Sequence, residues 1–245
     1  AYYLRDMFEH YGRRSVERPW GEETRFALFD QPFADQGAPV RDTLVGQEAL
    51  QGELFRALNN FVREGRPNRI VLMHGPNGSA KSTAAACIMR ALEHYSTLDV
   101  GALYRFHWVF PSQRELKGAI GFGGKRSAVS GADGSYAHLP EDQIDARLFV
   151  EVRDHPLFLL PEDARTALLD RLYRESGTQD PPPTWISSGN LSHKSKQVYE
   201  ALLSSYEGSL EEVLRHVQVE RYFISQRYRV GAVTLGPQLS VVAVS

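Results

Sequence analysis

The chain has 245 residues, of which 42% are hydrophobic and 24% charged, a globular composition that excludes a disordered or collagen-like chain. Its 28 Lys and Arg against 30 Asp and Glu give a net charge of −2, which argues against a broad nucleic-acid or membrane-surface binder. The single cysteine, Cys87, excludes an intramolecular disulfide and a CxxC-type zinc site, and it favours a reducing compartment.

No apolar run approaches the roughly 20 residues that a membrane-spanning helix needs. The first residues show neither the basic region nor the apolar stretch of a signal peptide. The sequence begins without a Met and ends on Leu239–Ser245, a strand-like run with nothing after it. We therefore expect the chain to be a piece of a longer protein.

The first third of the chain predicts helices around one short strand. Residues 1–42 mix aromatic and charged residues with proline turns, which predicts an irregular N-terminal arm with a short helix at Tyr3–Tyr11. From Gly46, leucines at helical spacing predict a helix that ends near Gly65. Next come Ile70–Met73, an apolar run typical of a buried parallel strand, and a helix over Ser82–His94.

The later elements alternate in the same way. We expect strands at residues 103–110, 222–224 and 228–235, helices at 161–175, 196–206 and 209–217, and a glycine-rich loop over 111–135. Strands that alternate with helices in the first half predict an α/β fold with a parallel sheet flanked by helices and a helical and strand insert toward the C-terminus.

The strongest chemical signal follows the first predicted strand. It approximates the P-loop pattern G-x-x-x-x-G-K-[ST] and reads Gly75, Pro76, Asn77, Gly78, Ser79, Ala80, Lys81, Ser82, with Thr83 next. Backbone N–H groups and the helix dipole at such a helix start attract an anion. Lys81 would reach the β- and γ-phosphates and is the catalytic candidate, while the Ser82 hydroxyl would bind Mg²⁺. The alternative, a strand–helix turn that binds nothing, fits the spacing and the flanking elements less well.

One position departs from this motif. Ala80 stands where the pattern has its second glycine. A methyl group there is tolerable at negative φ and strained at positive φ. With alanine at this position we still predict nucleotide binding, whereas the motif gives weaker support for efficient nucleotide turnover.

Upstream of the P-loop, the run Thr43–Glu48 resembles the segment with which AAA+ ATPases pack the adenine base. Val45 and Gly46 would then line the base. The alternative is an ordinary helix that begins at a glycine.

A family resemblance covers most of the chain. The runs that carry it are Tyr2–Phe8, Asp154–Leu157, Val213–Ser225 and Arg227–Thr234, and they resemble the PrkA-type serine protein kinases, bacterial proteins built around an AAA+ ATPase domain. The resemblance implies a P-loop NTPase fold of AAA+ type over residues 43–245, incomplete at the C-terminus. It also implies ATP and Mg²⁺ as ligands, a protein substrate, a cytoplasmic location and a homo-oligomer. The near-zero net charge predicts no nucleic-acid or membrane partner.

Kinase activity itself is implied by the resemblance and does not follow from the motifs. The H-R-D, D-F-G and V-A-I-K signatures of eukaryotic-type kinases are missing. Two alternatives therefore stay open: an ATP-driven protein-remodelling or protease-associated assembly, and a non-hydrolysing nucleotide sensor.

Three weaker patterns bear on these alternatives. Leu157–Asp163 is a candidate for the Walker B acid, but Pro161 favours a helix start with Glu162 and Asp163 in its first turn. Gly118–Gly124, with Phe122, is placed like an AAA+ pore loop, and a flexible loop whose Phe122 packs on the body is the plainer interpretation. Asn190 resembles a sensor residue but is more typical of a turn or cap.

Overall fold

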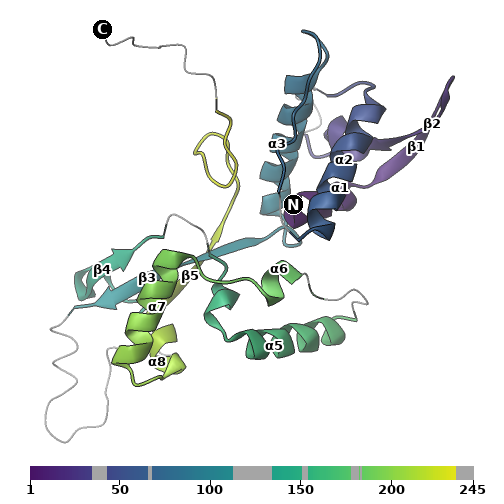
Figure 1. Ribbon diagram of the computed structural model, residues 1–245. Coiled ribbons are helices and arrows are strands. Elements are labelled where there is room, and N and C mark those ends of the chain that lie inside the picture. Colours follow the sequence, from purple (N-terminus) through teal and green to yellow (C-terminus); the bar gives the residue numbers. More distant parts are fainter. Residues whose placement is uncertain are drawn as a thin grey trace, which may run out of the picture. The chain divides into compact units, whose positions relative to one another are not determined.

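The computed structural model describes residues 1–34, 43–65, 68–112, 134–150, 154–177, 182 and 184–235. The chain divides into two compact units (Figure 1). The first unit contains the chain up to Leu103 and the residues from Phe223 onward, and the second contains Tyr104–Tyr222. Within the ranges that the structure describes, none of the helices has the length and apolarity required to cross a bilayer.

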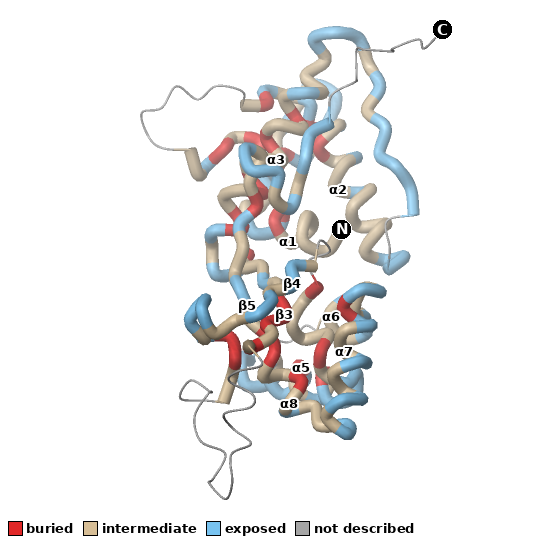
Figure 2. Tube along the Cα trace, turned by 90° about the vertical axis from the view of Figure 1, so that its left-hand side faces the viewer, coloured by how far each residue is buried: buried red, intermediate tan, exposed pale blue. Residues whose placement is uncertain are grey.

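The first unit is mainly helical and carries one β-hairpin. Its elements are α1 (Tyr2–Tyr11), β1 (Arg13–Arg18), β2 (Gly21–Phe26), the 3-10 helix η1 (Ala27–Asp30), α2 (Glu48–Arg63) and α3 (Lys81–Thr97). A single core joins them, with Phe8 of α1 in ring contact with Phe26, Phe29 and Phe55. One face of α3 contributes buried positions to this core (Figure 2). Its Ala84, Cys87 and Ala91 have no exposed surface.

The hairpin β1–β2 is a feature that the sequence pattern did not predict. Its strands pair antiparallel from Arg13 opposite Phe26 to Arg18 opposite Gly21, which leaves Pro19 and Trp20 as the turn. Most of its residues are exposed or half-buried, so neither strand shows the apolar alternation that marks a half-buried strand. The prediction of an irregular arm before residue 27 was therefore wrong for the hairpin and right for the helix α1.

The second unit is a three-stranded sheet with helices. Its elements are β3 (Leu103–Pro111), η2 (Glu141–Gln143), β4 (Ile144–Leu148), η3 (Pro156–Leu159), α5 (Glu162–Glu175), α6 (Thr184–Ser187), α7 (His193–Ser205), α8 (Leu210–Leu214) and β5 (Val217–Tyr222). The strand order is β4-β3-β5. The pair β3–β4 is antiparallel. The pair β3–β5 is also antiparallel, because Val109 lies beside His216 while the earlier Arg105 contacts the later Glu220. Phe106, Trp108, Leu159, Val213 and Val217 form its core.

The expected fold class was wrong. Instead of a parallel P-loop NTPase sheet of AAA+ type, the described residues form two small antiparallel sheets, one of two strands and one of three. The predicted strand Ile70–Met73 pairs with nothing in the described chain and has no regular secondary structure. Ile70 is 91% and Leu72 86% exposed, whereas a strand of a parallel sheet is covered on both faces.

Among the other predicted elements, the helices agree with the structure better than the strands do. The helices expected at Tyr3–Tyr11, from Gly46, at Ser82–His94, at residues 161–175 and at 196–206 are confirmed as α1, α2, α3, α5 and α7. The helix expected at 209–217 is confirmed only as the five-residue α8, because the chain enters β5 at Val217. The strand at 103–110 is confirmed as β3, whereas the strand at 228–235 is reduced to a single bridge between Ser225 and Val230. The strand-like run Leu239–Ser245 and the pore-loop candidate with Phe122 lie outside the described residues.

Candidate functional site

The P-loop-like sequence forms a closed loop at the start of α3. The Lys81 ammonium donates to the carbonyl oxygens of Gly75 and Pro76, each at 2.7 Å, and to the Ser79 hydroxyl at 2.9 Å. A backbone hydrogen bond also closes the turn, because the Ser79 N–H donates to the Pro76 oxygen at 3.3 Å. An ammonium group has three donors, and here all three point at the loop that precedes the helix. The loop is therefore wrapped around its own lysine.

Two backbone positions explain the residue types in this loop. A Cβ atom at Gly75 would lie 2.9 Å from the Ser79 hydroxyl oxygen, so glycine is what allows the loop to close. Ala80 has φ of +60° and occupies the left-handed region immediately before α3. An L-residue with a Cβ atom is strained there by roughly 1–2 kcal/mol, which is why the P-loop pattern has a glycine at this position. The loop thus keeps the glycine-like conformation although the residue is alanine.

A pocket of about 600 Å³ opens beside this loop. One wall is the extended segment before α3, which includes Val71, Met73 and His74, and it ends in Gly75, Pro76, Ser79 and Lys81. The other wall is one side of α2, with Gln47 just before the helix and Leu50, Glu53, Leu54 and Ala57 along it. A volume of this size suits a small-molecule ligand.

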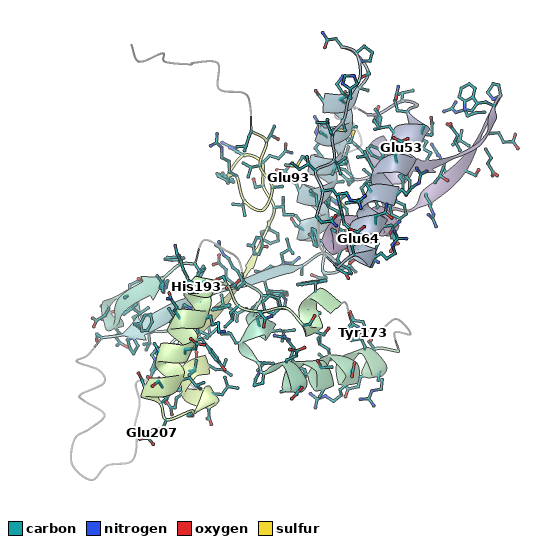
Figure 3. All side chains as sticks on the ribbon, in the orientation of Figure 1. Glu53, Glu64, Glu93, Tyr173, His193 and Glu207 are labelled. Atoms are coloured by element: carbon teal, nitrogen blue, oxygen red, sulfur yellow. The ribbon has the colours of Figure 1, made fainter. Side chains whose placement is uncertain are left out.

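The two walls run in opposite directions. A smaller pocket of about 200 Å³ continues the first one and shares Ala57 and Val71 with it. Beyond those shared residues, the smaller pocket is lined by later residues of α2, such as Phe61, and by earlier residues of the segment before α3, such as Arg69. The start of α2 therefore lies at the end of the pocket that holds Lys81, and Glu53 lies further along. Figure 3 labels Glu53 in the upper half of α2 and Glu64 at its lower end.

The α2 wall is fixed by a buried network of polar side chains. Glu48, with 4% of its side chain exposed, accepts from Arg25 at 3.1 Å and also from Arg18. Arg25 in turn donates to the Leu44 oxygen at 3.0 Å. The wholly buried Gln51 donates to the Gly46 oxygen at 3.1 Å and accepts from the Phe26 backbone N–H at 2.9 Å. These bonds tie the start of α2 to the hairpin.

The network also sets the protonation of Glu48. Burial alone would raise the pKa of this carboxyl group, but hydrogen bonds from its own backbone N–H, Arg18 and Arg25 outweigh it and leave the pKa below its ordinary value. Glu48 is therefore ionised at neutral pH and stays paired with the two guanidinium groups.

The predicted base-binding residues lie at the edge of this site. Val45 is 83% exposed and does not line the pocket. Gly46 has a φ of +72°, and its backbone oxygen accepts the hydrogen bond from the Gln51 side chain. The α2 wall is lined instead by residues that the sequence pattern did not single out for binding, namely Gln47, Ala49, Leu50, Glu53, Leu54 and Ala57. Their spacing on one face of a helix was visible, but it is equally the spacing of a core face.

The structure brings the phosphate-binding candidates together in two groups. Gly75, Pro76, Ser79 and Lys81 line the pocket, while Asn77 and Gly78 form the exposed outer turn. Ser82 is exposed and Thr83 half-buried in the first turn of α3, where backbone N–H groups lack an intrahelical partner. The Ser82 hydroxyl therefore stands at the helix start.

Other predicted functional residues have structural roles. Glu162 and Asp163 lie in the first turn of α5 behind Pro161, which confirms the helix start at this position. The Asn190 amide donates to the Ser188 oxygen at 3.4 Å, the local contact of a turn. In the part of the chain that the structure covers, no group of three or more His, Cys, Asp or Glu side chains could hold a metal ion.

The donor set and the shape of the pocket suit a nucleotide. One end offers an ammonium, a hydroxyl and a helix start, which are groups that hold phosphate and Mg²⁺. The remainder includes the apolar side chains of Leu50, Leu54, Ala57 and Val71, which could contact a base, together with the polar Gln47, Glu53 and His74. Scans against protein-family models, curated proteins and solved structures each find no match for this chain.

Proposed function

We propose that this chain is the ATP-binding part of an enzyme related to the PrkA-type serine protein kinases. It uses ATP with Mg²⁺ for phosphoryl transfer to a protein serine or threonine, or for ATP hydrolysis. The observation that supports the proposal is the loop from Gly75 to Lys81, which is closed around the lysine ammonium and lines a 600 Å³ pocket. A protein substrate, a cytoplasmic location and a homo-oligomeric state belong to the same proposal.

Lys81 is the residue whose chemistry matters most. Its ammonium is held by two carbonyl oxygens and one hydroxyl, all neutral acceptors. A phosphate oxygen carries a negative charge and forms a stronger, charge-assisted hydrogen bond with the same donors. When a triphosphate binds, the ammonium therefore exchanges part of its loop contacts for phosphate contacts. Catalysis of phosphoryl transfer is largely positioning and charge stabilisation, which a lysine at this position supplies.

Ser82 would hold the metal ion. Its hydroxyl is exposed one residue after Lys81, in the first turn of α3. Bound Mg²⁺ would neutralise phosphate charge and polarise the phosphoryl group. The first-turn N–H groups of α3 would donate to phosphate oxygens from the same side.

Nucleotide binding and phosphoryl transfer are tested separately. Binding is measured by titration calorimetry with ATP and Mg²⁺ for the wild-type chain and for Lys81→Ala. The loss of charge-assisted hydrogen bonds worth about 1.5–3 kcal/mol predicts affinity reduced by about 10- to 100-fold. The matched control is Lys194→Ala, which removes an exposed lysine from α7 in the other unit. The proposal fails if Lys81→Ala binds ATP as tightly as the wild type.

The reaction type is read from γ-labelled ATP incubated with casein. Labelled protein that disappears in Lys81→Ala supports the kinase. Free phosphate accompanied by unfolding or cleavage of the substrate supports the remodelling alternative. Retained ATP binding with neither product supports the nucleotide sensor and contradicts the enzyme proposal.

A further inference from the structure

The tip of the hairpin β1–β2 carries two exposed carboxylates that repel each other. Glu17 and Glu22 are direct cross-strand partners, and like charges in this arrangement weaken strand pairing. Glu22 accepts from Ser15, whereas the Glu17 carboxylate has no hydrogen bond or ion pair with the described residues. Trp20, in the turn between the strands, is 74% exposed. The tip therefore offers negative charge beside an uncovered aromatic ring.

The arginines of the hairpin do not neutralise this tip. Arg18 pairs with the buried Glu48, and Arg14 pairs with Asp30 at 3.2 Å. Arg13 stands at the base of the hairpin, about 13 Å along the strand from the tip. The negative charge at the tip is thus available to a cationic partner.

The turn Ser225–Val230 has the opposite chemistry. Arg227, Tyr228 and Arg229 are all exposed in it, and Tyr228 is 72% exposed. The Arg227 guanidinium lies 5.6 Å from the centre of the Tyr228 ring. Neither arginine forms an ion pair with the described residues. The turn therefore presents two guanidinium groups that no carboxylate neutralises.

Hydrogen bonds hold this turn on α3. The Glu93 carboxylate accepts from the Gln226 backbone N–H at 2.6 Å and from its side chain at 3.1 Å. The Ile224 backbone N–H donates to the Ser96 hydroxyl at 2.9 Å. Because the turn is already ordered, it loses little conformational entropy when a partner binds.

The hairpin tip and the turn both belong to the first unit, yet they lie on different sides of it. In Figure 1 the hairpin projects to the right of α3, and the turn, drawn in yellow, lies to the left of α3. A contact between them therefore needs two copies of the chain. Such a contact joins two different patches and is heterologous.

We infer that the hairpin tip of one copy binds the turn Ser225–Val230 of a second copy, an inference that rests on the homo-oligomeric state in the proposed function. The two guanidinium groups of the turn pair with the two carboxylates of the tip through charge-assisted hydrogen bonds. This pairing also removes the repulsion between the carboxylates. The exposed ring of Trp20 offers a face on which a guanidinium group can stack.

The test measures self-association by analytical ultracentrifugation without nucleotide, at about 50 mM and about 500 mM NaCl, because salt screens exposed charges. Each variant replaces two charged side chains by neutral amides, in the tip, in the turn or, as the matched control, on the exposed surface of α5: Glu17→Gln/Glu22→Gln, Arg227→Gln/Arg229→Gln and Arg171→Gln/Arg174→Gln. The wild type and the control should associate at low salt and dissociate at high salt. Each of the other two variants should associate at least about tenfold more weakly, since charge-assisted hydrogen bonds are lost from every contact.

A mixture of the tip variant and the turn variant is the sharpest measurement. Each of them keeps the patch that the other has lost, so a heterologous contact predicts a heterodimer that does not grow further. If the mixture forms no heterodimer, or if the α5 control is weakened equally, the inference is overturned.

The remaining outcomes separate this inference from the proposed function. If both variants associate as the wild type does, the surface is wrong and the homo-oligomeric state stands. If the wild type is a monomer at low salt, the surface and the homo-oligomeric state both fail. In either case nucleotide binding is decided separately by the ATP titration of Lys81→Ala.

Discussion

The two units of this protein bury charge in different ways. The first unit buries an ion pair, Arg25 with Glu48, which joins the hairpin to the start of α2. In the second unit, two buried charged side chains have neutral partners instead. Arg165, only 2% exposed, donates to the carbonyl oxygens of Ser187 and Gly189 at 2.7 and 2.8 Å, and the Asp154 carboxylate accepts from Ser192.

The second unit also buries neutral histidines. His216 is 3% exposed and lies between the Val109 oxygen at 2.8 Å and the Tyr206 hydroxyl at 2.7 Å. Burial lowers the pKa of His216, an effect that the Val109 carbonyl only partly opposes. At His155, burial and the nearby Arg165 lower the pKa to about 4. The unit with the candidate site thus depends on a buried ion pair, whereas the other unit depends on neutral partners for Arg165 and Asp154 and on histidines that stay uncharged.

The largest predicted effect breaks the ionic anchor of the first unit. Among the described residues, Glu48→Ala leaves the buried Arg25 with Asp30 and the Leu44 oxygen as partners, and it removes the ion pair of Arg18 with Glu48. Because Asp30 still pairs with Arg25, the expected loss is about 1–3 kcal/mol, the cost of leaving buried donors unsatisfied. The free energy of unfolding from urea titration should fall by that amount, and ATP binding should weaken because Gln47 and Leu50 stand on the same helix start.

The matched control for this change is Asp170→Ala, which removes an exposed acid from α5. Surface substitutions of this kind change the free energy of unfolding by less than about 0.5 kcal/mol. If Glu48→Ala costs no more than Asp170→Ala, the ion pair does not anchor the unit.

Mild acid should affect the two units differently. A histidine whose folded pKa is lowered adds full stability above its unfolded pKa, near 6.5, and stability is lost as the pH falls below that value toward about 4. For the partly exposed His155 this predicts a loss of about 1 kcal/mol between pH 7 and pH 5. Glu48 has the opposite sign: its lowered pKa preserves its stabilisation down to about pH 4.5, and the loss occurs only below that value.

Tryptophan fluorescence can separate the units in this experiment. Trp108 and Trp185 belong to the second unit, with Trp108 wholly buried, and Trp20 is the exposed residue of the hairpin turn. In a Trp20→Phe background, urea unfolding followed by fluorescence reports the second unit. Its midpoint should fall between pH 7 and pH 5, and His155→Gln should remove part of that fall. A midpoint that is the same at both pH values would contradict neutral burial of the histidines.

The comparison also shows which parts of the molecule the sequence could predict. The helices were predictable because their signals are local: Leu50, Leu54 and Leu58 recur at helical spacing, and Pro161 stands directly before α5. The strand Ile70–Met73 was mispredicted because β-branched and apolar residues show a tendency to extend but do not supply a neighbouring strand. Nothing in its composition shows that Ile70 and Leu72 are exposed.

The candidate site, like the fold, could be predicted from the sequence only where its contacts are local. The loop from Gly75 to Lys81 follows a motif, and the hydrogen bonds of Lys81 are made within seven residues. Glu53 and Gln47 were missed because their place in the pocket depends on how α2 lies against the segment before α3. The buried partners Arg25 and Glu48 are 23 residues apart, and no local pattern links them.

The smallest predicted effect concerns Ala80 and tests whether backbone strain adds to the ionic anchor of the first unit. Ala80→Gly should raise the free energy of unfolding by about 0.5–1 kcal/mol, because relief of strain at φ of +60° exceeds the conformational entropy that glycine adds to the unfolded chain. Ala167→Gly, in the exposed middle of α5, is the matched control and should lower it by about 1 kcal/mol. Urea titration of both variants measures the difference in sign. If the two variants lose equal free energy of unfolding, Ala80 is not strained. The conformation of the site in the first unit then depends on the buried ion pair and not on backbone strain.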